Sequence, residues 1–149
     1  MASRDDGVPL PIWRRAGCWC KTGGMTVAIG AQFGRATRLD IHELVRELNA
    51  ALGPTLVAAA TGSKDRKLPL KWAKDDGPRP GFDFERRLRL MSRTWSTVAA
   101  HEGAHVARAW FIGANPFLGE RTPLTAIRDD DAAEISRAVT SFLDDIVDA

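Results

Sequence analysis

The chain has 149 residues, 44% of them hydrophobic and 27% charged, which is enough to build one globular domain of ordinary size or two very small ones. Its apolar runs all fall short of the roughly 18 residues that a membrane span needs, and its N-terminus lacks the apolar core of a secretory signal. The two cysteines, Cys18 and Cys20, are too close together to staple a fold, so we expect a cytoplasmic protein in a reducing environment.

The net charge of +2 conceals an uneven distribution. Residues 1–98 carry 17 Lys and Arg against 10 Asp and Glu, whereas residues 99–149 carry 4 against 9, so the two parts have net charges of +7 and −5. A basic part is typical of proteins that bind a polyanion such as DNA, and an acidic part favours a basic protein surface. Two differently solvated faces of one fold would give the same counts, and composition does not separate these interpretations.

Residues 1–38 show neither the period of a strand nor that of a helix, and Gly, Pro, Trp and Arg are mixed among them. We therefore expect this segment to be disordered or loosely attached to the fold. Met25 follows two glycines, whose codons can form a ribosome-binding sequence, so Met25 is a candidate for the true start of translation.

Short helices are expected in the first half of a domain that spans residues 39–98. Asp40 and Glu43 form a capping box before an apolar stripe with helical spacing, and Gly53 ends that helix. A second helix follows and stops at Gly62. A short helix, a glycine-containing turn and another short helix are the parts of a helix-turn-helix DNA-binding unit.

A basic cluster follows the second of these helices. The residues that would face DNA are Ser63, Lys64, Arg66, Lys67, Lys71 and Arg79. Pro69 in a helix interior would cost about 3 kcal/mol, so the next helix is expected to begin near Leu68 and the cluster to lie in a loop. Specific DNA binding and a purely structural helix-turn-helix both stay open.

Helical patterns continue to the end of the chain. Asp83 is expected to cap a longer helix, further apolar spacing leads to Gly113, and Asp131 with Glu134 forms a second capping box before the last helix. No strand with regular alternation appears after residue 38. The expected fold class is all-α, with a helix-turn-helix bundle followed by a small helical domain over residues 99–149.

An ordered set of motifs in that second domain resembles the toxin-binding domain of the Xre/MbcA/ParS antitoxin family. The matching residues are Trp110, Asn115, Pro116, Leu118, Gly119, Thr122, Pro123, Leu124 and Ile127. Thr122 and Pro123 are expected to be the N-cap and first residue of a single helical turn. The resemblance covers about residues 40–149 and includes an Xre-like helix-turn-helix. It departs from the family at Asp129–Asp131, where a glycine is common, and a slightly different turn is expected there.

This resemblance implies an antitoxin that blocks the NAD pocket of a RES-domain toxin, an NAD-degrading protein that looks like an ADP-ribosyltransferase. Many family members also repress their own operon. The implied partners are the toxin, operator DNA and, in a homodimer, a second copy; no enzyme activity and no cofactor are implied. The toxin-binding residues it implies are Trp110, Asn115, Pro116, Leu118, Thr122, Pro123, Ile127 and Arg128. Most of these residues are individually expected to build the domain rather than to touch a partner, and a solitary helix-turn-helix regulator is the alternative function.

One further motif favours a different class of protein. His101-Glu102-Gly103-Ala104-His105 satisfies H-E-x-x-H, in which two imidazoles on successive helical turns bind zinc and the glutamate acts as a general base. Gly103 is unfavourable inside a helix, and Glu102 projects into an apolar stripe, so we expect the helix to bend or break here. We expect no metal site, and a zinc metallopeptidase is the weakest alternative.

Overall fold

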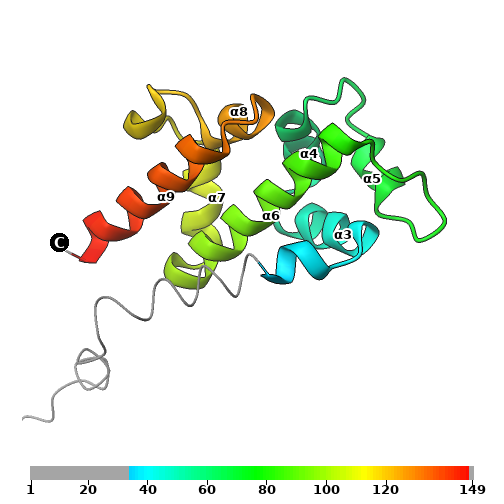
Figure 1. The fold of residues 1–149 in the computed structure, drawn as a ribbon, viewed down its shortest axis with the longest axis horizontal. Helices are drawn as coiled ribbons and strands as arrows, with labels where there is room; N and C mark the ends of the chain where they lie inside the picture. The colour runs from blue at the N-terminus through cyan, green and yellow to red at the C-terminus, as the bar shows by residue number, and fades with distance from the viewer. Residues whose placement is uncertain (1–33, 148–149) are drawn as a thin grey trace, which may run out of the picture.

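The computed structural model describes residues 34–147, and within this range it contains helices and no strands, which confirms the all-α prediction (Figure 1). A helical turn covers residues 34–38. The helices that follow are α3 (Ile41–Ala51), α4 (Pro54–Thr61), α5 (Leu68–Trp72), α6 (Phe82–Glu102), α7 (Ala104–Ile112), the 3-10 turn η1 (Pro116–Leu118), α8 (Pro123–Arg128) and α9 (Ala132–Val147). None of these helices is both long and apolar enough to cross a membrane.

Helix α6 is the element around which the others pack. It is 21 residues long, runs diagonally through the molecule in Figure 1, and contacts α3, α4, α7, α8 and α9. Leu88, Met91 and Val98 on α6 are fully buried, in one hydrophobic cluster with side chains from both ends of the described chain. The domain boundary expected between residues 98 and 99 falls inside α6, and buried residues on both sides of that boundary belong to one hydrophobic core.

The first helices begin and end where local chemistry favours it. The Asp40 carboxylate accepts a hydrogen bond from the backbone N–H of His42 (3.0 Å) and thereby caps α3. Gly62, at the end of α4, has a φ of 80°, in the left-handed region that glycine adopts without steric cost. The predicted cap at Asp83 is wrong: α6 begins at Phe82 after Gly81, and Asp83 lies in the first turn, where a carboxylate favours the helix dipole.

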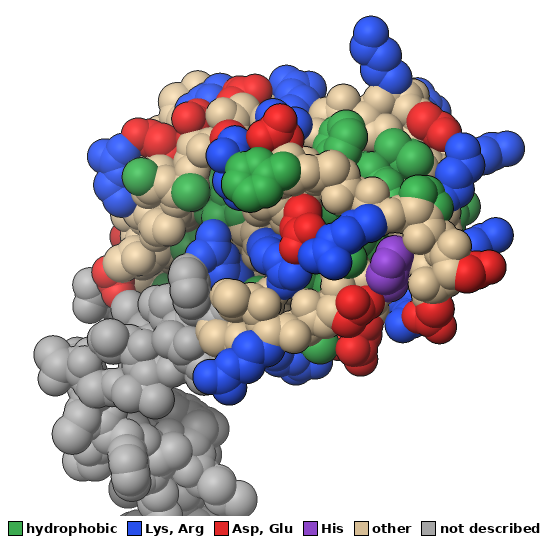
Figure 2. Space-filling model, turned by 45° about the vertical axis from the view of Figure 1, so that its right-hand side comes forward, with side chains coloured by type: hydrophobic (Ala, Val, Ile, Leu, Met, Phe, Trp, Pro, Cys, Tyr) green, Lys and Arg blue, Asp and Glu red, His purple; other side chains and the backbone are tan. Residues whose placement is uncertain are grey.

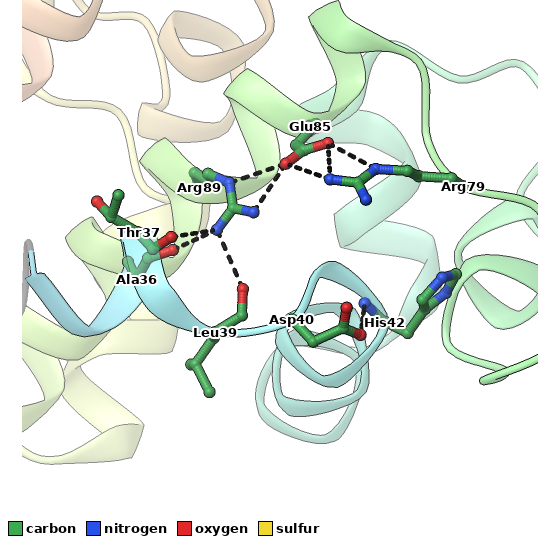
Figure 3. A network of polar contacts seen from close by, with 8 residues as sticks. All are labelled: Ala36, Thr37, Leu39, Asp40, His42, Arg79, Glu85 and Arg89. Carbon is green, nitrogen blue, oxygen red and sulfur yellow. Dashed lines mark hydrogen bonds and ion pairs between the residues drawn. The ribbon is translucent and has the colours of Figure 1, made fainter.

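The packed chain starts earlier than residue 39. Ala36 is buried, and the Arg89 guanidinium donates a hydrogen bond of 2.6 Å to its carbonyl oxygen (Figure 3). Arg89 also forms an ion pair with Glu85, and the same Glu85 carboxylate forms a second ion pair with Arg79. Residues 34–38 are therefore held against α6. The predictions for residues 1–33, including a start at Met25, lie outside the described residues.

Candidate interaction surfaces

The segment between α4 and α5 is a loop tied together by its own side chains. We call residues 62–67 the basic loop. Ser63 Oγ donates to the carbonyl oxygen of Asp65 (3.0 Å), and the Asp65 carboxylate accepts from Lys67 N (2.8 Å) and Lys71 Nζ (3.2 Å). The hydrogen bond from the Lys67 backbone, followed by that from the Lys71 side chain, lowers the pKa of Asp65 below its ordinary value. The one carboxylate of the loop is thus engaged by the loop and the helix that follows it.

Three of the six residues predicted to face DNA remain exposed and carry no ion pair among the described residues: Lys64, Arg66 and Lys67. Ser63 is half-buried, and Lys71 and Arg79 are paired with Asp65 and Glu85, respectively.

Helix α5 begins at Leu68 with Pro69 in its first turn, as predicted, and is only five residues long. Ser63, Lys64, Arg66 and Lys67 therefore lie in a loop rather than on the face of a helix, whereas Lys71 lies in α5 and Arg79 in the segment before α6. On the face shown in Figure 2, Lys and Arg side chains lie beside Asp and Glu side chains instead of forming an unbroken positive surface.

A turn after α7 is fixed by a single buried residue, Asn115. Its side-chain Oδ1 accepts a hydrogen bond from Phe117 N (2.9 Å), and its backbone N donates to the carbonyl oxygen of Arg121 (3.1 Å). Its carbonyl oxygen in turn accepts from Leu118 N (2.9 Å) and Glu120 N (3.0 Å). One asparagine therefore closes the turn from several sides, and the η1 segment is held in one conformation.

The residues that the resemblance implies for toxin binding divide into a buried set and an exposed set. The buried ones are Trp110, Asn115, Leu118, Pro123 and Ile127. Thr122 is half-buried and caps α8 as predicted, its hydroxyl accepting from Thr125 N (3.2 Å). Pro116 and Arg128 are exposed. The buried set builds the scaffold, and only exposed neighbours are in a position to meet a partner.

Sequence reasoning did not single out Phe117, which lies between two of the matching residues. Its side chain is 49% exposed although its backbone is fixed by Asn115. Phe117 lines a groove of about 400 Å³ between η1 and α9, together with Ser136, Arg137, Thr140 and Ser141. We call these residues, with Pro116, the η1–α9 surface. The signal in the sequence was a large aromatic residue placed between turn-forming residues.

The three aspartates before α9 all form ion pairs with arginines. Arg121 Nη1 lies 3.1 Å from an Asp129 carboxylate oxygen and 2.8 Å from one of Asp131, and Arg86 of α6 pairs with Asp130. Asp130 has a φ of 67°, in the left-handed region where a glycine is favoured and where aspartate is among the better tolerated residues. The residue that departs from the family pattern thus occupies a glycine-like conformation.

The H-E-x-x-H motif does not lie on one helix. Helix α6 ends at Glu102, Gly103 has a φ of 85°, and α7 begins at Ala104, so the predicted break is confirmed. His101 and His105 are exposed on different helices and lack the one-turn spacing that brings two imidazoles onto one zinc ion. Within residues 34–147, no three His, Cys, Asp or Glu side chains come together in a way that could hold a metal ion.

Comparisons with known proteins give no assignment. No family model, no curated protein and no solved structure matches the chain. On the exposed side chains described above, the candidates for binding a partner are the basic loop after α4 and the η1–α9 surface.

Proposed function

We propose that this chain is the cytoplasmic antitoxin of a type II toxin–antitoxin pair and that it binds a RES-domain toxin and blocks its NAD pocket. The resemblance of the motifs between Trp110 and Ile127 to the Xre/MbcA/ParS family motivates the proposal. The observation that carries it is the turn fixed by Asn115, which holds the exposed ring of Phe117 beside the groove along α9.

An ordered, exposed aromatic ring is well suited to anchor a protein partner. A side chain whose backbone is already fixed loses little conformational entropy on binding, and aromatic residues are enriched among those that dominate interface energies. The groove beside Phe117 can take a side chain from the partner. The hydroxyl groups of Ser136 and Thr140 donate to carbonyl oxygens within α9, and their oxygens can accept hydrogen bonds from a partner along the wall of the groove. The buried members of the motif then serve to keep this surface in place.

The charge of this part of the chain supports the same partner. Residues 99–149 have 4 Lys and Arg against 9 Asp and Glu, a net charge of −5, and Asp144 and Asp145 are exposed on α9. A pocket that binds an anionic dinucleotide is expected to be cationic at its rim. Opposite charges at the edge of an interface mainly accelerate association.

The test is neutralisation of a RES-domain toxin encoded beside this gene, measured as growth and cellular NAD after co-expression. Phe117→Ala should weaken toxin binding by about 10- to 100-fold, the usual effect of losing an aromatic anchor. Phe82→Ala is a matched control, because Phe82 is 78% exposed at the start of α6 and does not line the groove between η1 and α9.

Two outcomes would contradict the proposal at different levels. If the toxin stops growth and consumes NAD equally with and without the wild-type chain, the antitoxin assignment is wrong. If Phe117→Ala and Phe82→Ala neutralise the toxin equally well, the antitoxin assignment stands but the η1–α9 surface is not its interface.

A second function, binding to operator DNA, is favoured by the basic loop. Lys64, Arg66 and Lys67 are exposed, and the only carboxylate of the loop is engaged by its neighbours. Cations in this state can contact phosphates without first breaking an ion pair. Changing all three to Gln should lower the slope of log K against log salt by about 0.9 for each phosphate that is no longer neutralised, measured with the duplex upstream of the gene. An unchanged slope would mean that the loop does not contact DNA.

A further inference from the structure

The end of α8 lies directly against the end of α4, where the basic loop begins. A Cβ atom built on Gly62 would lie 3.3 Å from Arg128 Cγ and 3.4 Å from Arg87 Nη1. Arg87 Nη1 also donates a hydrogen bond of 2.7 Å to the carbonyl oxygen of Thr61, the last residue of α4. Two arginines from distant parts of the sequence thus meet the first residue of the basic loop.

The three aspartates that follow Arg128 in the sequence form their close ion pairs with other arginines. Asp129 and Asp131 pair with Arg121, and Asp130 pairs with Arg86. Within residues 34–147, the ion contact of Arg128 is a long one, at 3.7 Å to Asp129, and its side chain is 50% exposed. A surface ion pair at this distance contributes little, so the Arg128 guanidinium can take another anion at small cost.

We propose that Arg128 and the basic loop form one phosphate-binding surface, which contacts the backbone of duplex DNA with residues from both halves of the chain. Arg87 is a positioning residue in this surface, because its hydrogen bond to Thr61 holds the end of α4 at the start of the loop. Arg128, although its place in the motif implied a toxin contact, binds DNA. The inference rests on the DNA-binding part of the proposed function and is independent of the toxin.

Duplex DNA fits this arrangement because its phosphates form a dense, regular row of charges. Cations on separate segments can each neutralise a phosphate of that row, and the release of counterions supplies the affinity. A guanidinium also binds phosphate through two parallel hydrogen bonds, which makes arginine effective at the edge of such a surface. The loop cations Lys64, Arg66 and Lys67 and the neighbouring Arg128 together provide the positive charge of this surface.

The experiment measures fluorescence anisotropy of a short labelled duplex of arbitrary sequence titrated with the full chain at salt concentrations from about 50 to 200 mM. Arg128→Gln should lower the slope of log K against log salt by about 0.9 and weaken binding several-fold at the lowest salt. Arg128→Lys should keep most of the slope, since it keeps the charge. Arg35→Gln is the matched control: it removes the same charge from an exposed arginine that pairs with Glu47 of α3 and lies outside both candidate surfaces, and the slope should not change.

The outcomes separate this inference from the proposals on which it builds. If Gln substitutions in the basic loop lower the slope and Arg128→Gln does no more than Arg35→Gln, the inference is overturned while DNA binding stands. If the wild-type chain does not bind the duplex at the lowest salt, both are overturned. Arg128→Gln should still neutralise the toxin; a loss of neutralisation with an unchanged salt slope would place Arg128 in the protein interface and overturn the inference.

Discussion

Arg89 is predicted to be the residue that holds the beginning of the described chain against α6. Its guanidinium donates to the carbonyl oxygens of Ala36 (2.6 Å), Leu39 (3.3 Å) and Thr37 (3.4 Å), as Figure 3 shows. The same group contacts a Glu85 carboxylate oxygen through two nitrogens, at 2.7 and 3.1 Å. Arg89→Met removes all of these hydrogen bonds and keeps an unbranched apolar side chain of similar length.

The expected loss of stability follows from these contacts. The Arg89 side chain is only 24% exposed, and hydrogen bonds that involve a charged group each contribute about 1.5–3 kcal/mol net. The two longer carbonyl contacts count for little, so one good carbonyl bond and the Glu85 pair remain. The carbonyl bond contributes about 1.5–3 kcal/mol and the solvent-accessible pair with Glu85 about 0–1 kcal/mol, so we expect Arg89→Met to lower the free energy of unfolding by about 2–4 kcal/mol.

Arg79→Met is the matched control, since Arg79 binds the same carboxylate. Arg79 is 66% exposed, and its contacts with Glu85 are 3.2–3.3 Å long. An exposed pair of this kind contributes about 0–1 kcal/mol. The assay is urea unfolding of the full chain followed by circular dichroism at neutral pH. If Arg89→Met costs no more than Arg79→Met, the carbonyl contacts of Arg89 do not hold residues 34–39, and the reasoning is refuted.

Three further predictions test the site and its surroundings. Burial raises the pKa of Glu85, but hydrogen bonds from Arg89 and Arg79 lower this pKa more, to below its usual 4.5. The stability that the Glu85 carboxylate contributes should therefore be fully present above pH 4.5 and be lost as the pH falls through the folded-state pKa. Urea unfolding of Glu85→Gln should lack this loss. Asn115→Ala leaves the Phe117 N–H without its acceptor and should lower the free energy of unfolding by about 1–2 kcal/mol, whereas Asn115→Asp should retain most of the stability. Equal stability of Asn115→Ala and wild type in the same urea assay would contradict this. Elemental mass spectrometry of the purified chain should find well under one zinc per chain, and stoichiometric zinc that disappears in His101→Ala or His105→Ala would revive the peptidase alternative.

The ends of the helices could be predicted where a single residue decides them. Gly62 and Gly103 have positive φ values that favour glycine, and Pro69 is compatible only with the first turn of α5, so each acts through its own backbone. The predicted start of α6 was wrong, because aspartate is favourable both as a cap and in the first turn. Position alone distinguishes these two roles, and the sequence around Asp83 is compatible with either.

Contacts between distant residues could not be predicted in the same way. Arg89 binds carbonyl oxygens about 50 positions earlier in the chain, and no periodic pattern near residues 34–38 signals that contact. The proximity of Arg128 to Gly62 depends on how α8 packs on α4, which follows from the shape of the core. Phe117 was not singled out for a different reason: the residues that match the family pattern are mostly buried scaffold residues, whereas a binding surface consists of the exposed residues between them.

Consecutive residues of α6 determine how the basic loop and Arg128 lie relative to each other. Arg86 pairs with Asp130 in the turn after α8, and Arg87 donates to Thr61 at the end of α4. The end of α4 and the turn after α8 are therefore both bound to the same helical turn of α6, and α4 and α8 also pack on α6 through the common core. A phosphate-binding surface made from residues far apart in sequence needs such a fixed distance, because cations that move independently would lose entropy on binding. Helix α6 fixes the position of the basic loop relative to Arg128, so the proposed DNA-binding site depends on the packing of both halves of the chain on this helix.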